Sequence, residues 1–181
     1  MEKAWAFANS DNREGILEAL VDLYEKDVVN LAFTYVKDWS TAEDITQEVF
    51  LKIYKKMHTF EDRSNVKTWI YRIAINQCKD FLKSRYVRSI FLTNRIQRYS
   101  GRDDKGAEGH LLKSLENAEL ARSVFQLPVK LREVILLFYY KEFTIEEISE
   151  TLNISSSAAR TRLSRARDAL RKLHGRSGEN G

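Results

Sequence analysis

The side chains whose types and spacing most clearly suggest chemistry lie near the C-terminus, between Ser155 and Leu173. This stretch has one acidic residue, Asp168, and six basic residues, a local balance of +5: Arg160, Arg162, Arg165, Arg167, Arg171 and Lys172. The preceding stretch, 141–151, has four Glu against one Lys, or −3. Binding to nucleic-acid phosphates requires positive charge gathered in this way, although a solvated basic face on a bundle helix would show the same charges.

The residues around this charge predict a helix-turn-helix. Thr144-x-x-Glu147 has the form of a capping box, residues 153–155 form the expected turn, and Ser155 or Ser156 can cap a second helix. The second helix has an apolar stripe made of Ala159, Leu163, Ala166, Leu170 and Leu173. Its opposite face carries Ser157, Thr161, Ser164 and Asp168, flanked by Arg160, Arg165 and Arg171. Arginines near the start of such a helix can contact guanine bidentately, and Ser or Thr can bond bases or phosphates.

Composition limits the class of protein that carries this motif. The chain has 181 residues, of which 43% are hydrophobic and 31% charged, which suffices for packed cores. The longest apolar run, Val134–Tyr140, is far shorter than the roughly 18 residues of a membrane span, and the N-terminus does not resemble a signal peptide. We therefore expect a cytoplasmic protein without direct membrane insertion.

No pattern in the chain predicts an enzyme. Cys78 is alone, the histidines His58, His110 and His174 share no ligand spacing, and no phosphate-binding loop or nucleophile elbow is present. We accordingly predict no catalytic residues, no metal site and no cofactor.

The distribution of glycine divides the chain. Three of the seven glycines fall between Gly101 and Gly109 and three more in the last seven residues, so the remaining stretches favour helices. We predict an all-α protein with two small helical domains joined by a flexible basic linker, the C-terminal domain being the helix-turn-helix. The predicted bounds are 1–85, a linker at 86–112, 113–174, and a disordered tail at 175–181.

The N-terminal half is expected to form three or four amphipathic helices. One apolar stripe starts at Ile16 and Leu20, and a second helix starts at a capping box formed by Ser40 and Glu43. A third helix is predicted over about 67–86. Aromatic residues on such stripes are usually part of the core, but Trp69 could equally serve as a core anchor or as a binding residue.

Several motifs together resemble those of one family. The segment LPVKLREVILLFYYKEFTIEEISETLNISSSAARTRLSRARDALRKL resembles the promoter-binding C-terminal domain of extracytoplasmic-function (ECF) sigma factors of the sigma-70 family. The N-terminal half carries the partner motifs AEDITQEVFLKIYKKM and TWIYRIAINQCKDFLKSR in the matching order. The resemblance implies a subunit that binds core RNA polymerase, directs it to specific promoters and helps to open the DNA.

The resemblance implies that the AEDxxQEVF helix binds a coiled coil of the largest polymerase subunit. The corresponding residues are Asp44, Gln47, Glu48, Leu51 and Lys52. The periodicity agrees for the first four, which lie off the stripe of Val49 and Ile53, although a solvated acidic face is the alternative.

The TWIYRIAIN segment is similar to the family element that captures the opened minus-ten strand. By this resemblance Asn76, with the loop 61–66, lines a pocket for a flipped base. The predicted minus-ten contacts are Lys67, Trp69, Tyr71, Arg72, Asn76 and Lys79.

The basic linker also fits the family, in which it runs close to nucleic acid inside the polymerase. Six basic residues and no acidic residue lie between positions 83 and 102: Lys83, Arg85, Arg88, Arg95, Arg98 and Arg102. A merely solubilising tether is the alternative.

The minus-35 contacts implied by the resemblance are Ser156, Ser157, Arg160, Thr161, Ser164 and Arg165. The chain departs from the family after the turn, where Ala158 and Ala159 replace the usual Thr-Val pair. This departure removes a hydroxyl that could cap the helix or contact phosphate, and Ser156 and Ser157 could supply the cap instead.

The expected partners are promoter DNA, the coiled coil and flap region of core RNA polymerase, and an anti-sigma protein, which in this family is often membrane-bound. Two rival interpretations stay open at this point. A stand-alone helix-turn-helix regulator would bind duplex DNA without polymerase, and an interaction module would bind polymerase or a regulator without binding DNA.

Overall fold

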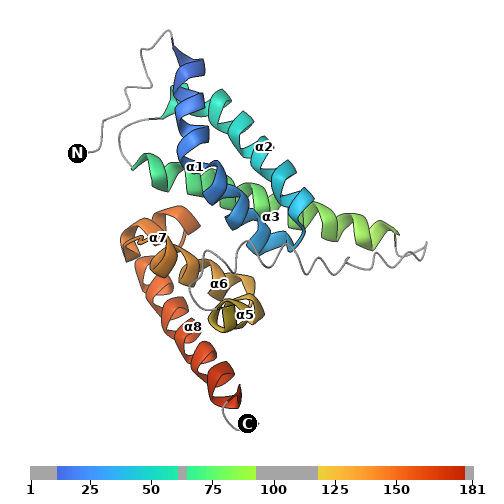
Figure 1. Ribbon diagram of the computed structural model, residues 1–181, viewed down its shortest axis with the longest axis vertical. Helices are drawn as coiled ribbons and strands as arrows, with labels where there is room; N and C mark the ends of the chain where they lie inside the picture. Colours follow the sequence, from blue (N-terminus) through green and yellow to red (C-terminus); the bar gives the residue numbers. More distant parts are fainter. Residues whose placement is uncertain (1–11, 61–64, 93–117, 178–181) are drawn as a thin grey trace. The chain divides into compact units, whose positions relative to one another are not determined.

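The computed structural model describes residues 12–60, 65–92 and 118–177, which fold as helices in two separate units (Figure 1). The chain divides between Asp104 and Lys105. No strand occurs in the described ranges, and the predicted all-α class is confirmed. Residues 93–117, which contain most of the predicted linker, lie outside the described part of the chain.

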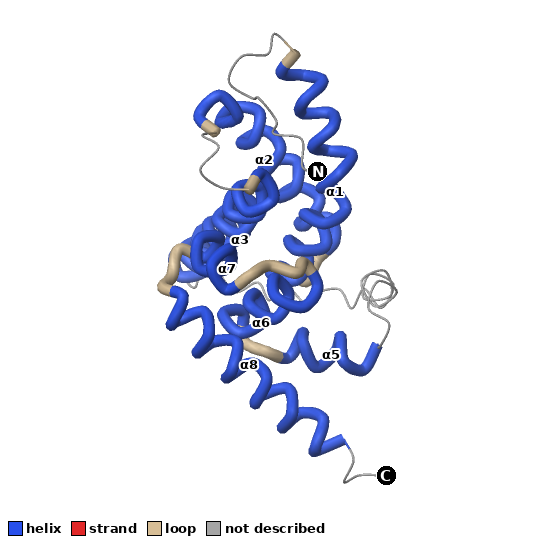
Figure 2. Tube along the Cα trace, turned by 90° about the vertical axis from the view of Figure 1, so that its left-hand side faces the viewer, coloured by secondary structure: helices blue, strands red, loops and turns tan. Residues whose placement is uncertain are grey.

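Unit 1 consists of three packed helices and one short 3-10 turn. Helix α1 spans Arg13–Val36, α2 spans Trp39–Lys56, η1 spans Met57–Thr59 and α3 spans Val66–Leu92 (Figure 2). Each helix contributes apolar side chains to one core, among them Leu20, Val28, Ile45, Val49, Ile53, Ile70 and Ile75. Helix α3 continues to Leu92, past the position at which we expected the linker to begin.

The junction between α1 and α2 corrects one sequence prediction. The chain leaves α1 through Lys37, whose φ of 55° lies in the left-handed region, and Asp38 then caps α2 by accepting the Thr41 N–H at 2.9 Å. The predicted capping box of Ser40 and Glu43 is therefore wrong, because the cap lies two residues earlier, at Asp38, and the helix starts at Trp39. Hydrogen bonds from Thr41 lower the pKa of the Asp38 carboxyl, so the cap stays ionised. Its negative charge interacts favourably with the dipole of α2.

Unit 2 contains the helix-turn-helix. Helix α5 spans Ala118–Gln126, α6 spans Val129–Ile135 and continues as the π-helical segment η2, Leu136–Tyr140; α7 spans Ile145–Leu152 and α8 spans Ser156–Ser177. The helices α7 and α8 meet at the predicted turn. Helix α8 extends to Ser177, into the range that was predicted as a disordered tail.

The caps of the helix-turn-helix follow the sequence closely. The capping box of Thr144 and Glu147 is confirmed, with the Glu147 N–H bonded to Thr144 Oγ1 at 3.2 Å and the carboxylate accepting the Thr144 N–H at 2.8 Å. Asn153 takes a left-handed φ of 52° in the turn. Ser155, rather than Ser156 or Ser157, caps α8 by accepting the Ala158 N–H at 3.1 Å.

Two buried charged groups hold α6 in place. Glu133 is 1% exposed and accepts a hydrogen bond from Arg162 Nη1 of α8 at 3.0 Å. Arg132 donates from Nη2 to the carbonyl oxygens of Phe125 and Leu127 at 3.0 and 2.8 Å. The first contact joins α6 to α8, and the second ties α6 to the end of α5.

Glu133→Gln should destabilise unit 2 by about 2–3 kcal/mol, because it removes the charge that compensates Arg162 at a buried position. Urea unfolding of the full chain can be followed by far-UV circular dichroism, which reports the helices of both units. Unit 1 can be followed separately by tryptophan fluorescence, since Trp5, Trp39 and Trp69 all precede residue 104. The fluorescence transition should not change.

Asp168→Asn is the matched control, because the Asp168–Arg171 pair is exposed and should contribute less than about 1 kcal/mol. Equal effects of the two substitutions would contradict the structural role of the buried pair.

Candidate nucleic-acid interface

Helix α8 presents the predicted DNA contacts on its exposed side. Ala159, Leu163 and Ala166 are 1%, 4% and 0% exposed and pack into unit 2. Six predicted residues occupy the rest of the helix surface: Ser157, Arg160, Thr161, Ser164 and Arg165 are exposed, and Ser156 is half-buried. The Thr161 hydroxyl donates to the Ser157 carbonyl at 2.9 Å, so it keeps only acceptor capacity for an external partner.

The structure separates the α8 arginines into two groups, which sequence reasoning had treated as one. Arg162 is bound to buried Glu133. Arg167 Nε donates to Tyr139 Oη at 2.8 Å, and its guanidinium lies 5.5 and 5.6 Å from the ring centroids of Phe138 and Tyr139. Both arginines are thus engaged by side chains of unit 2, Arg162 by a buried group and Arg167 at the surface.

Arg160, Arg165 and Arg171 are exposed as well. Arg160 is paired with Glu146 of α7 at 3.3 Å, and Arg171 with Asp168 at 3.2 Å. Arg165 is exposed and forms no ion pair with any other described residue. No local sequence signal distinguishes these residues from Arg162 and Arg167, since the partners of the latter two are about 28 positions away.

Helix α2 carries an exposed acidic surface. Asp44, Gln47 and Glu48 are exposed and Leu51 is 54% exposed, while Ile45, Val49 and Ile53 face the core. We call these four exposed residues the acidic α2 face. Lys52 is half-buried and donates from Nζ to Gln77 Oε1 of α3, so it lies toward α3.

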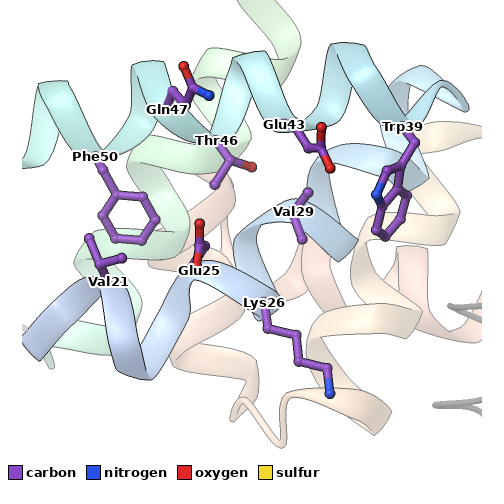
Figure 3. A pocket seen from close by; sticks show the side chains of 9 residues that line it. All are labelled: Val21, Glu25, Lys26, Val29, Trp39, Glu43, Thr46, Gln47 and Phe50. Carbon is purple, nitrogen blue, oxygen red and sulfur yellow. The ribbon is translucent and has the colours of Figure 1, made fainter. Parts of the chain in front are cut away.

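A groove of about 520 Å³ lies beside the acidic α2 face, between α1 and α2 (Figure 3). We call it the α1–α2 groove; it is lined by Val21, Glu25, Lys26, Val29, Trp39, Glu43, Thr46, Gln47 and Phe50. Gln47 belongs to both the groove and the acidic face. Sequence reasoning missed the groove because its two walls come from different helices, whose register against each other is not encoded locally.

Helix α3 holds the residues predicted to contact the minus-ten strand, but their exposure differs. Asn76 is exposed, whereas Lys67, Trp69, Arg72 and Lys79 are half-buried. The Trp69 ring packs edge-on against Phe60, with centroids 5.2 Å apart, so it is partly a core residue. Of the predicted pocket loop, residues 61–64 lie outside the described ranges.

Tyr71 corrects the minus-ten prediction. Its side chain is 0% exposed, and its hydroxyl donates to Asp27 Oδ2 of α1 at 3.0 Å. Burial, together with the charge of Asp27, raises the pKa of the Tyr71 hydroxyl well above its ordinary value, so it remains a protonated donor. Tyr71 therefore joins α3 to α1 and does not face DNA.

The basic residues predicted for the linker are described only in part. Lys83 and Arg85 are exposed on α3, and Arg88 lies within α3 without a described side chain. Arg95, Arg98 and Arg102 lie outside the described ranges.

The described residues contain neither a membrane-spanning helix nor a cluster of metal ligands. None of the described helices combines the length and apolarity needed to cross a membrane. No group of three or more His, Cys, Asp or Glu side chains in the described ranges could hold a metal ion.

Comparison with known proteins identifies the family. The model for sigma-70 region 2 matches residues 20–87, and the model for sigma-70 region 4 matches residues 118–170. The ECF RNA polymerase sigma factor SigW of Bacillus subtilis (strain 168) is 33% identical over 163 residues, covering 84% of this chain and 86% of SigW. The chain belongs to the ECF sigma factors. As such a factor, it directs RNA polymerase to promoters.

Solved structures of sigma factors share the fold. RpoE from Bartonella quintana, solved with the anti-sigma factor NepR, has a TM-score of 0.68 at 20% identity and covers 88% of this chain and 97% of that chain. CnrH, solved with the cytosolic domain of CnrY, has a TM-score of 0.64 at 20% identity, covering 90% and 89%. Within this ECF sigma factor, region 2 corresponds to unit 1 and region 4 to unit 2.

Tyr71→Phe should lower the stability of unit 1 by about 1–2 kcal/mol, because it removes a hydrogen bond to a carboxylate from a buried position. Tryptophan fluorescence during urea unfolding measures this change. Minus-ten strand binding by the folded variant with polymerase should stay unchanged. Unchanged stability combined with impaired strand binding would restore Tyr71 as a DNA contact.

Proposed function

We propose that the two units of this sigma factor divide the work of promoter recognition. Unit 1 docks on core RNA polymerase through α2 and takes up the opened minus-ten strand on α3, while unit 2 places α8 in the major groove of the minus-35 element. The observation that supports this proposal is that all three helices bury one side in a core, while α2 and α8 expose most of the polar side chains predicted to bind and α3 exposes Asn76. The protein acts in the bacterial cytoplasm without catalytic activity of its own, and the polymerase supplies the chemistry.

The polymerase contact is centred on the acidic α2 face. Leu51 offers an exposed apolar group beside Asp44 and Glu48, which suits a basic helical surface such as the coiled coil of the largest subunit. The α1–α2 groove continues this surface through Gln47 and adds the acidic rim of Glu25 and Glu43. Lys52, by contrast, contributes through its bond to Gln77, which joins the docking helix to α3.

The minus-ten contact is centred on Asn76, the exposed member of its group. Arg72 and Lys79 lie four residues before and three residues after it, which places all three on one side of α3. Lys67 and Trp69 lie near the start of the helix, next to the loop that precedes it. This arrangement suits a flipped base at Asn76 with phosphates along the positive side chains.

The minus-35 contact uses Arg160 and Arg165 for base edges or phosphates. Ser156 and Ser157 precede Arg160 on α8, and Thr161 and Ser164 lie between the two arginines. A helix-turn-helix inserts its second helix into the major groove with the N-terminal residues against the bases, which matches the position of these side chains in α8. Buried Ala159 shows that the smaller residue after the turn still packs against unit 2.

Unit 2 offers a second surface for the polymerase flap region. A groove of about 610 Å³ is lined by apolar residues of α5, α6, η2 and α8, including Val124, Ile135 and Leu170, with Arg167 and Arg171 at its edge. An apolar helix of the flap with acidic neighbours fits this groove. An anti-sigma protein, the kind of partner with which RpoE was solved, is a further proposed partner of this factor.

Replacing Asp44→Asn and Glu48→Gln together should weaken binding to core polymerase by about 10-fold, because the acidic α2 face loses two charges. Binding can be measured by fluorescence anisotropy with labelled protein and core enzyme. The matched control is Glu14→Gln with Glu18→Gln, which removes two exposed charges from the start of α1. An equal loss of polymerase affinity in both double variants would show that the effect comes from net charge alone and not from the acidic α2 face.

Asn76→Ala should slow open-complex formation by about 10-fold while leaving affinity for core polymerase unchanged, because the pocket for the flipped base loses its polar contacts. Permanganate reactivity of unpaired thymines measures opening. Ser84→Ala, at an exposed position of the same helix, is the control. A parallel loss of opening and polymerase affinity would rule out this role for Asn76.

A further inference from the structure

One ion pair links the two helices of the helix-turn-helix at their exposed surface. Arg160 Nη2 lies 3.3 Å from Glu146 Oε1, and the two side chains are 62% and 69% exposed. Glu146 belongs to the first turn of α7, and Arg160 lies near the start of α8. Ile148 of α7 and Ala159 of α8 are buried in unit 2, whereas Glu146 and Arg160 are exposed, so the pair lies on the outer surface of the helix-turn-helix.

This pair distinguishes Arg160 from the other arginines of α8. Arg162 is bound to buried Glu133, Arg167 donates to Tyr139, and Arg171 pairs within its own helix. Arg160 alone among them is both placed near the start of the recognition helix and held by a carboxylate from the neighbouring helix. The Arg160 guanidinium is therefore oriented in the free protein, and 62% of the Arg160 side chain is still exposed.

The chemistry of the pair favours base contacts over phosphate contacts. A guanidinium has five N–H donors in a planar fork, and Glu146 engages one of its terminal nitrogens, so other donors remain for a base edge such as guanine. A phosphate would have to compete with the carboxylate for the same charge, and the carboxylate itself repels the DNA backbone. Holding one contact group in place by a supporting side chain is a common route to specificity.

We propose that Glu146 is a specificity-determining residue of the minus-35 contact, where it positions Arg160 toward a base and opposes sequence-independent binding to phosphate. This role rests on the proposed insertion of α8 into the major groove. Glu146 acts through Arg160 and needs no base contact of its own.

The test uses the full chain with core polymerase and a promoter library that is randomised across the minus-35 element. Sequencing the transcripts gives the base preference at each position for each variant. Arg160→Ala should abolish the preference at the position that Arg160 contacts. Glu146→Gln should reduce the preference at that same position by about two- to five-fold, the range expected for an exposed ion pair, and should change nothing further in the Arg160→Ala background.

Glu150→Gln is the matched control, since it removes the same charge from an exposed position of the same helix. It should alter the total transcript yield at most, and leave every base preference intact. Circular dichroism melting of all variants checks that the fold is retained.

The role of Glu146 is overturned if Glu146→Gln leaves the preference at the Arg160 position intact, or if it has the same effect with and without Arg160. If instead Arg160→Ala leaves every preference intact while the wild-type chain directs transcription, the proposed base contact of Arg160 is wrong as well, and the role of Glu146 falls with it.

Discussion

Helices α2, α3 and α8 must each contribute both to the core and to the exposed polar surface, because the units are too small for a helix that serves the core alone. Helices α2, α3 and α8 each bury one side, through Val49, Ile75 and Leu163, and leave the other side to polar residues. The free energy of burying the apolar side fixes the rotation of the helix about its axis. That rotation in turn decides which polar residues can reach a partner, so core packing and recognition are two consequences of one amphipathic pattern.

The charged residues of unit 2 show the same constraint in more detail. Glu133 is buried in α6 and binds Arg162, and this contact fixes α8 against α6 near the exposed residues Arg160 and Arg165. Arg160 and Arg165, two and three residues away on the same helix, thereby remain outside. One arginine of this basic helix thus stabilises the fold, while others on the same helix are exposed and can contact a partner. The net charge of the segment overstates the number of side chains that are free to bind DNA.

The sequence was sufficient for what depends on local spacing: the helical class, the capping box of Thr144 and Glu147, the turn before α8 and its apolar stripe. The sequence was not sufficient where two neighbouring residues could both cap a helix, or where a residue distant in the chain determines whether a side chain is buried. Asp38 and Ser40 are both acceptable helix caps, and the hydrogen bond from the Thr41 N–H to Asp38 Oδ2 shows that Asp38 is the one used. Tyr71 lies at the edge of a polar stripe, and Asp27, 44 residues earlier, places it inside. The α1–α2 groove requires the pairing of two helices, which no local pattern contains.

Our proposal is that the exposed sides of these helices direct polymerase to promoters while the buried sides hold the fold. Its most direct test is transcription in vitro from a fragmented genomic library by core polymerase, with the wild-type chain or with a chain carrying Arg160→Glu and Arg165→Glu. The wild-type chain should produce transcripts from a small shared set of promoters, and the variant should lose them without a change in melting temperature. Transcription of the same set by the variant, or an absence of transcripts with the wild-type chain while it binds duplex DNA alone, would contradict the account.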